Sequence, residues 1–231
     1  MIKLYDLATK YPDIRFSPFC WRIKYALAHK GLVWKEIPIC FTEKDLLPKP
    51  NEGKVPVLID DDHVVFDSWD IALYLDRKYP KASLFDGNES RAQSLFVKNW
   101  TETVLHSLVS RMGILDFYDA QKEPDKKHFR KTRESRFGIA LEDWGGNPEA
   151  ARVEFLKALD PLRHTLRTQN FLGGLEPNFS DYIMVGIFQW MRCGSRLKVF
   201  EVSDDVFDYQ ERLLDLFDGL GRSSPAYASI G

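Results

Sequence analysis

The fold is decided by the residues SPFCWRIKYAL at positions 17–27, which follow a short alternating segment, IKLY, at positions 2–5. Ser17 is a typical helix N-cap, because its hydroxyl can accept hydrogen bonds from the exposed amides of the first turn. Pro18 suits the first helical position, where no backbone hydrogen bond is lost, and Lys30-Gly31 is a typical C-terminal stop. We therefore predict a strand near residue 2, followed by a helix that begins at Ser17-Pro18.

The next 50 residues predict three more strands and a second helix. Residues 32–39 favour a strand, and residues 55–59 and 63–66, joined by three aspartates, favour a hairpin. Pro56 cannot donate a ladder hydrogen bond, so its strand is either an edge strand or irregular at that residue. Asp67-Ser68 then caps another helix. The expected order is β-α-β-β-β-α.

Helical periodicity dominates the rest of the chain. The expected helices lie near residues 89–120, 126–145, 149–169, 179–195 and 205–219. Gly and Pro pairs such as Gly173-Gly174 punctuate them. We therefore expect an α/β domain at residues 1–82 and an all-α domain at residues 89–231.

Composition and charge exclude several classes of protein. The 231 residues carry 32 Lys and Arg against 34 Asp and Glu, a net charge of −2 that does not support binding to nucleic acid. Cys20, Cys40 and Cys193 form neither a disulfide framework nor a metal-ligand spacing, and no histidine pair suggests a metal. The apolar run 183–191 is too short to span a membrane. We expect a cytoplasmic protein without a bound metal.

Two residues in the first turn of the expected helix have a structural and a chemical interpretation. Ser17 is either a plain cap or a hydroxyl that stabilises an anion, such as a thiolate, in the positive field of the helix N-terminus. Cys20 is either a small buried side chain or a thiol whose pKa the same field lowers. A C-x-x-C redox pair would need a cysteine where Ser17 stands.

Two later motifs are ambiguous in the same way. Val55-Pro56 is either an ordinary edge-strand pair in trans or a cis peptide, which would turn the amide and carbonyl of Val55 outward to an extended ligand. Asp67-Ser68 is either a cap, or a site where the Ser68 hydroxyl holds a ligand carboxylate and Asp67 accepts from a ligand ammonium. Their order within a β-α-β-β-β-α unit is much less ambiguous than each motif alone.

Together these motifs resemble the glutathione site of cytosolic glutathione transferases, in which the first domain is thioredoxin-like. NFSD at positions 178–181 is similar to the helix capping box of that family, with Asn178 as the cap and Asp181 reaching back. The resemblance covers essentially the whole chain. The resemblance implies that glutathione is the co-substrate and that the protein forms a homodimer.

The resemblance also implies a role for each site residue. Ser17 would donate its hydroxyl proton to the glutathione sulfur, and Val55, next to Pro56, would pair with the cysteinyl backbone. Ser68 would hold the γ-glutamyl carboxylate, with Asp67 near its ammonium. Phe19 is a further expected contact. Lys54 is either the partner of the glycyl carboxylate or a solvated surface lysine.

Several stretches resemble a narrower group, the β-etherase-like glutathione transferases, which include bacterial lignin-ether cleaving enzymes and fungal relatives. These stretches are SPFCWRIKYAL at 17–27, DSW at 67–69, YLDRKYP at 74–80, RESRF at 133–137 and DLFDGLGR at 215–222. Cys20 departs from the aliphatic residue expected in the bacterial enzymes. The family places the acceptor pocket between the domains, which implies that Phe16, Phe19, Leu115 and Tyr118 line it.

Three functions follow as hypotheses. The first is a glutathione transferase acting on apolar aromatic electrophiles, with aryl-ether cleavage as its narrower version. The second is a carrier of phenolic or aromatic ligands with little turnover, and the third is a thiol oxidoreductase that uses Cys20.

Residues 122–136 hold seven Lys or Arg, which form either a solvated helix face or a rim that attracts glutathione or an aromatic acid.

Overall fold

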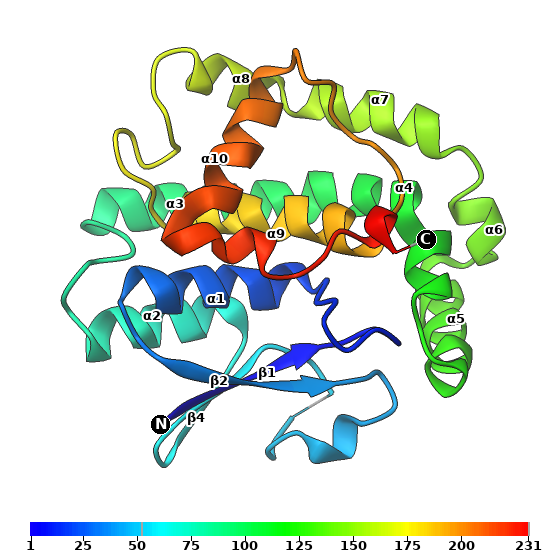
Figure 1. Ribbon diagram of the computed structural model, residues 1–231, viewed down its shortest axis with the longest axis horizontal. Coiled ribbons are helices and arrows are strands. Elements are labelled where there is room, and N and C mark those ends of the chain that lie inside the picture. Colours follow the sequence, from blue (N-terminus) through cyan, green and yellow to red (C-terminus); the bar gives the residue numbers. More distant parts are fainter. Residues whose placement is uncertain (52, 231) are drawn as a thin grey trace.

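The structure is a computed structural model that describes residues 1–51 and 53–230, and it confirms the predicted fold class (Figure 1). The first part of the chain is a thioredoxin-like unit with a four-stranded mixed sheet. Its elements are β1 (Ile2–Leu7), α1 (Pro18–His29), β2 (Trp34–Ile39), the short turn η1 (Lys44–Leu46), β3 (Val57–Asp60), β4 (His63–Phe66) and α2 (Ser68–Lys78). This is the order that the sequence predicted.

The sheet has the strand order β2-β1-β3-β4. β1 runs parallel to β2 and antiparallel to β3, and β3 runs antiparallel to β4. Tyr5 lies opposite Val57, which in turn lies opposite Phe66. This register brings the residues before β3 and those after β4 to the same end of the sheet as the C-terminal end of β1.

The second part of the described chain is helical. Its elements are α3 (Asn88–Trp100), the π-helical turn η2 (Thr101–Leu105), α4 (His106–Asp119), α5 (Glu123–Phe137), α6 (Leu141–Trp144), α7 (Pro148–Ala158), α8 (Asp160–Leu166), α9 (Phe179–Gly194), α10 (Asp205–Gly219) and the 3-10 turns η3 (Leu220–Arg222) and η4 (Tyr227–Ser229). Three of the segments expected as single helices are divided into separate elements. The turn η2 separates α3 from α4, Gly138 ends α5 in the left-handed conformation, and Asp160-Pro161 begins α8 after α7.

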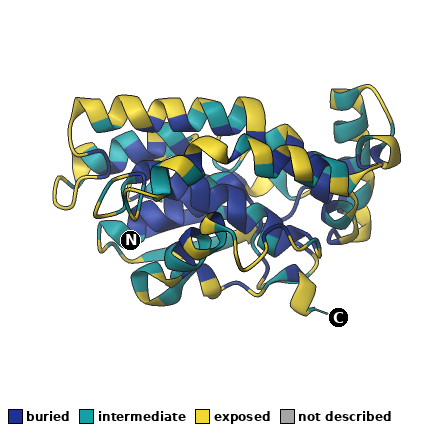
Figure 2. Cartoon of the chain, turned by 90° about the horizontal axis from the view of Figure 1, so that it is seen from above, coloured by how far each residue is buried: buried dark blue, intermediate teal, exposed yellow. Residues whose placement is uncertain are grey.

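Helix α9 is the centre of the core. It packs on α1, which separates it from the sheet, as Figure 1 shows. Gly186 lies so close to the carbonyl of Pro18 that no Cβ would fit there, so this glycine sets how near α9 comes to the start of α1. Figure 2 shows the buried interior beneath helices whose outer faces are exposed.

The predicted capping box at the start of α9 is present. The Asn178 side chain accepts from the amide of Ser180 at 2.8 Å, and Asp181 accepts from the amide of Asn178 at 3.0 Å. Asp181 also accepts the Tyr209 hydroxyl at 2.6 Å, which ties α9 to α10. None of the helices in residues 1–51 and 53–230 has the length and apolar character that crossing a membrane requires.

Candidate active site

The strand register brings the three sequence motifs to one end of the sheet. Ser17 stands at the start of α1, beyond the C-terminal end of β1. Val55-Pro56 directly precedes β3, whose first residue pairs with both β1 and β4. Asp67 directly follows β4 and starts α2. The site is therefore built from the N-termini of α1 and α2 and from the extended backbone at Val55-Pro56, before β3.

Ser17 caps α1 as predicted. Its hydroxyl oxygen accepts from the amide of Cys20 at 3.3 Å, and its carbonyl accepts from the amide of Trp21. The side chain is buried, so a ligand atom must come close to the helix end to reach it. Because a serine hydroxyl accepts and donates at once, this cap leaves a proton to donate.

Cys20 lies on the inner side of the first turn and is 0 % exposed. Its Sγ is 3.8 Å from the carbonyl oxygen of Tyr5, in β1. Burial, followed by the negative charge of Asp6, raises the pKa of the Cys20 thiol well above its usual value. The thiol is therefore held protonated, as in a structural cysteine.

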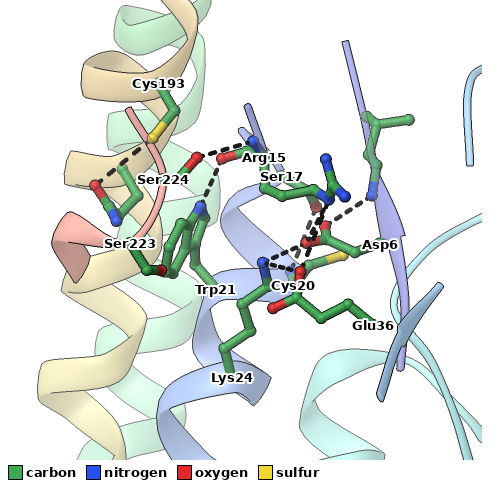
Figure 3. A network of polar contacts seen from close by, with 12 residues as sticks. Asp6, Arg15, Ser17, Cys20, Trp21, Lys24, Glu36, Cys193, Ser223 and Ser224 are labelled. Carbon is green, nitrogen blue, oxygen red and sulfur yellow. Dashed lines mark hydrogen bonds and ion pairs between the residues drawn. The ribbon is translucent and has the colours of Figure 1, made fainter. Parts of the chain in front are cut away.

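A buried ionic cluster lies next to Cys20 (Figure 3). Lys24 Nζ is 2.6 Å from Asp6 Oδ2 and 3.0 Å from Glu36 Oε2, and Arg15 Nε is 3.8 Å from both carboxylates. Burial lowers the pKa of Lys24, but the two carboxylates outweigh burial and raise it overall. The cluster joins α1 to β1 and β2 and holds the helix start against the sheet.

The Val55–Pro56 peptide bond is cis, as one of the two interpretations of the motif required. Val55 is partly exposed. Within residues 1–51 and 53–230, neither its amide nor its carbonyl has a hydrogen-bond partner. These groups are therefore available to pair with an extended backbone.

Asp67 and Ser68 begin α2 in an unusual conformation. Asp67 accepts from the amide of Trp69 at 2.8 Å, and its φ of 64° is one that non-glycine residues rarely adopt. Such strain costs about 1–3 kcal/mol and is typical of ligand sites. The Ser68 hydroxyl has no hydrogen-bond partner among the residues described, so it is available to an anion at the helix N-terminus.

Lys54 and Phe19 are the remaining predicted glutathione contacts. Lys54 is exposed, and Asn51 holds its backbone through bonds of 2.9 and 3.1 Å. Phe19 is half-buried beneath the Arg22 guanidinium, 4.9 Å from its ring centroid, and it contacts His106 edge-on at 5.3 Å. Phe19 therefore contacts the His106 end of α4.

The four predicted acceptor-pocket residues do not form one cluster. Phe19 lies at the His106 end of α4, whereas Phe16 is buried against Phe117, near the other end. Tyr118 packs beside Phe129 of α5. Leu115 is exposed and lies near Gly145, after α6, so its place in the acceptor pocket stays a prediction. The face of α4 that turns toward Phe16 carries Phe117 instead.

The sequence analysis missed two residues that shape this region. Arg22 is 1 % exposed and bonds Glu102 of the π-helical turn at 2.7 Å. Phe41 follows β2 and contacts both Phe16, at 6.4 Å, and Phe129, at 5.5 Å. A charge in a strongly apolar helix was the available signal for Arg22, while nothing in its sequence surroundings distinguished Phe41.

Two domain models match most of the chain. The model described as "Glutathione S-transferase, N-terminal domain" matches residues 12–83. The model described as "Glutathione S-transferase, C-terminal domain" matches residues 92–202. Among curated proteins, glutathione S-transferase U22 of Arabidopsis thaliana is 24 % identical over 199 residues, which cover 82 % of this chain and 76 % of the relative.

A shorter alignment and two solved structures agree with these matches. Glutathione S-transferase Z1 of Arabidopsis thaliana is 40 % identical over 68 residues, covering 27 % of this chain and 31 % of the relative. Glutathione transferase GSTFuA3 from Phanerochaete chrysosporium superposes with a TM-score of 0.80 at 20 % identity, over 92 % of this chain and 95 % of that chain. A glutathione S-transferase of Ceriporiopsis subvermispora in complex with glutathione gives 0.77 at 24 %, over 94 % and 96 %. At these identities the two structures share the fold.

Proposed function

The chain belongs to the glutathione S-transferase family, and we propose that it is a serine-type transferase that activates the thiol of glutathione for attack on apolar aromatic electrophiles. The observation that carries the proposal is the position of Ser17. Its hydroxyl stands at the N-terminus of α1, where the helix field favours an anion. Donating its proton to the glutathione sulfur stabilises the thiolate over the thiol, so Ser17 itself need not ionise.

The backbone of Val55 and the start of α2 support the binding of glutathione in an extended conformation. The amide and carbonyl of Val55 bond no other described residue, which suits pairing with the cysteinyl unit. The Ser68 hydroxyl and the helix N-terminus suit the γ-glutamyl carboxylate, and the Asp67 carboxylate suits the ammonium. Lys54 is the proposed partner of the glycyl carboxylate.

The acceptor is proposed to lie on the Phe16 side of Ser17. Phe16, Phe41, Phe129 and Tyr118 form a continuous series of ring contacts there, which suits a planar apolar substrate. Aryl-ether cleavage is the narrower proposal, in which a phenolate leaves as the thiolate attacks carbon. The sulfur–carbon bond forms as the carbon–oxygen bond breaks, and the phenolate oxygen takes the bonding pair.

The two other hypotheses make different demands on the site. A Cys20-based oxidoreductase needs an accessible thiolate, whereas Cys20 is buried and its pKa is raised. We therefore do not propose it. An aromatic carrier differs from the transferase only in turnover, so it is distinguished by assay with a chromogenic electrophile.

The test is the ionisation of bound glutathione, followed through the ultraviolet absorbance of its thiolate. We expect the wild-type protein to hold glutathione as the thiolate at neutral pH and the Ser17→Ala variant to bind it as the thiol. Turnover should fall by roughly 10²-fold. Asn147→Ala is the matched control, because it removes an N-cap from α7, far from the site. Thiolate formation that survives in Ser17→Ala would contradict the proposed role of Ser17.

A further inference from the structure

Among the residues that the structure describes, no carboxylate pairs with Arg133 of α5. Its guanidinium carbon lies 4.5 Å from the ring centroid of Phe129 and 5.0 Å from that of Phe41. Its one hydrogen bond to another described side chain goes to Thr132 Oγ1, at 3.0 Å. Burial, followed by the charge of Arg136, lowers the pKa of Arg133 to about 10. Aromatic rings therefore position this guanidinium, and no carboxylate of the described chain neutralises its charge.

A second cation approaches the same place from the other domain. The Lys44 side chain, in η1, lies against Gly53, two residues before Val55. Burial, followed by the charge of Arg133, lowers the pKa of Lys44. Among the described residues, no carboxylate pairs with its ammonium group. The charges of Lys44 and Arg133 repel each other, and an anion bound between them would relieve that repulsion.

His128 adds an unpartnered polar atom. Its ring stacks on Phe41 at 6.2 Å, and its buried Nε2 has no hydrogen-bond partner within the described chain. Burial, followed by the charges of Lys44 and Arg133, lowers the pKa of His128, so its ring is neutral. A neutral imidazole can still donate one N–H. Leaving a buried donor or acceptor unpaired costs about 1–3 kcal/mol unless a ligand satisfies it.

We propose that Lys44, His128 and Arg133 form a subsite for the carboxylate of an aromatic acid acceptor. This inference rests on the proposed function, because it names the class of acceptor used by the same site. Arg133 supplies a planar fork that matches a carboxylate, and Lys44 supplies a point charge. The rings of Phe41 and Phe129 lie against the fork, so an acid that carries an aromatic ring fits both surfaces.

The position of the subsite favours the acceptor over glutathione as the source of the carboxylate. Two of its three groups, Arg133 and His128, belong to the helical part of the chain, whereas the groups proposed to bind glutathione all belong to the sheet part. Phe41 also connects the subsite to Phe16, the residue before Ser17, at 6.4 Å. A ligand that spans these rings would direct its reactive end toward Ser17 and its carboxylate toward Arg133.

The test is calorimetric titration of the full chain with 4-hydroxycinnamate and with its neutral amide, with and without glutathione. We expect the wild-type protein to bind the acid roughly tenfold more tightly than the amide. Arg133→Gln and Lys44→Gln should each abolish this preference, and Arg133→Lys should retain part of it. Lys127→Gln is the matched control, because it removes the same charge from an exposed position on α5. Melting curves show whether each variant is folded.

Each result separates the alternatives. Equal affinity of the wild-type protein for acid and amide would overturn the subsite. The subsite would also be overturned if Arg133→Gln bound glutathione more weakly but kept its preference for the acid. The cations would then hold the glycyl carboxylate of glutathione. Failure of the wild-type protein to bind glutathione at all would overturn the proposed function instead, and the titrations without glutathione distinguish that outcome.

Discussion

Arg22 of α1 and Glu102 of the π-helical turn form an ion pair of 2.7 Å that joins the two parts of the chain. Arg22 is 1 % exposed, and Glu102 also bonds Lys98 at 2.8 Å. The turn that carries Glu102 interrupts the α-helical hydrogen bonding between α3 and α4, and such π-helical turns occur frequently at functional sites. Because Arg22 also covers Phe19, the pair connects the helical part directly to the predicted glutathione site.

Glu102→Ala should destabilise the protein by about 3 kcal/mol, because it leaves the Arg22 charge buried and unpaired. The measurement is chemical denaturation of the variant against the wild-type protein. Lys98→Gln is the matched control, since it removes the more exposed partner of the same carboxylate and should cost less than about 1 kcal/mol. If the two variants lose equal stability, the buried pair has no special role.

We expect the His106 side chain to make the free energy of unfolding depend on pH. Burial, followed by the charge of Arg22, lowers its pKa to about 3. Its pKa is lower in the folded than in the unfolded state, so its contribution is complete above about pH 6.5 and is lost as the pH falls toward 3. Between pH 7 and pH 5 this loss amounts to about 2 kcal/mol. His106→Gln should reduce the loss of unfolding free energy over that interval by this amount, and an unchanged pH profile would contradict it.

The motifs at the helix starts could be predicted because capping is a local property. Ser17, Asp67 and Asn178 each accept from an amide within three residues, so sequence alone specifies them. The proline at position 56 marks its own irregularity in the same way. For this reason the sequence alone predicted the element order and the three motifs of the candidate site, at Ser17, Val55-Pro56 and Asp67-Ser68.

The buried charges and the facing of α4 could not be predicted in that way. The ion pair with Glu102 accounts for the burial of Arg22, but Glu102 lies 80 residues away along the chain. Without knowledge of that partner, the helix pattern places a charged side chain in solvent. Leu115 and Phe117 have equal claims to an apolar face, since periodicity identifies a helix but not its rotation against a distant domain. The structure turns Phe117 toward Phe16 and Leu115 toward Gly145.

Cys20→Ala should keep most of the transferase activity and lose stability through packing. The buried thiol is replaced by a smaller side chain against β1, which should cost roughly 1–2 kcal/mol. Denaturation and turnover measured on the same preparation separate the two effects. Cys40→Ala is a useful comparison, because it removes a buried thiol near η1 instead. Loss of activity together with loss of a glutathione adduct on Cys20 would favour the oxidoreductase hypothesis.

Ser68→Ala tests the proposed position of the γ-glutamyl carboxylate. The cap of α2 is the Asp67 side chain and not the Ser68 hydroxyl, so this variant should unfold like the wild-type protein. A lost hydrogen bond to a charged group is worth about 1.5–3 kcal/mol, which predicts a rise of roughly tenfold or more in the Kd and KM for glutathione. Because the interaction is made equally before and during the reaction, kcat should stay close to the wild-type value.

The control for this last prediction is Ser135→Ala, an exposed serine on α5 that should change neither constant. A second comparison uses glutathione whose γ-glutamyl carboxylate is amidated, for which Ser68→Ala should cause a much smaller loss than for glutathione itself. If Ser68→Ala weakens both ligands equally, the hydroxyl acts through the shape of the site and not through that carboxylate. If kcat falls while KM is unchanged, Ser68 acts in the transition state. The proposal that Ser68 binds glutathione while Ser17 activates its thiol would then be wrong.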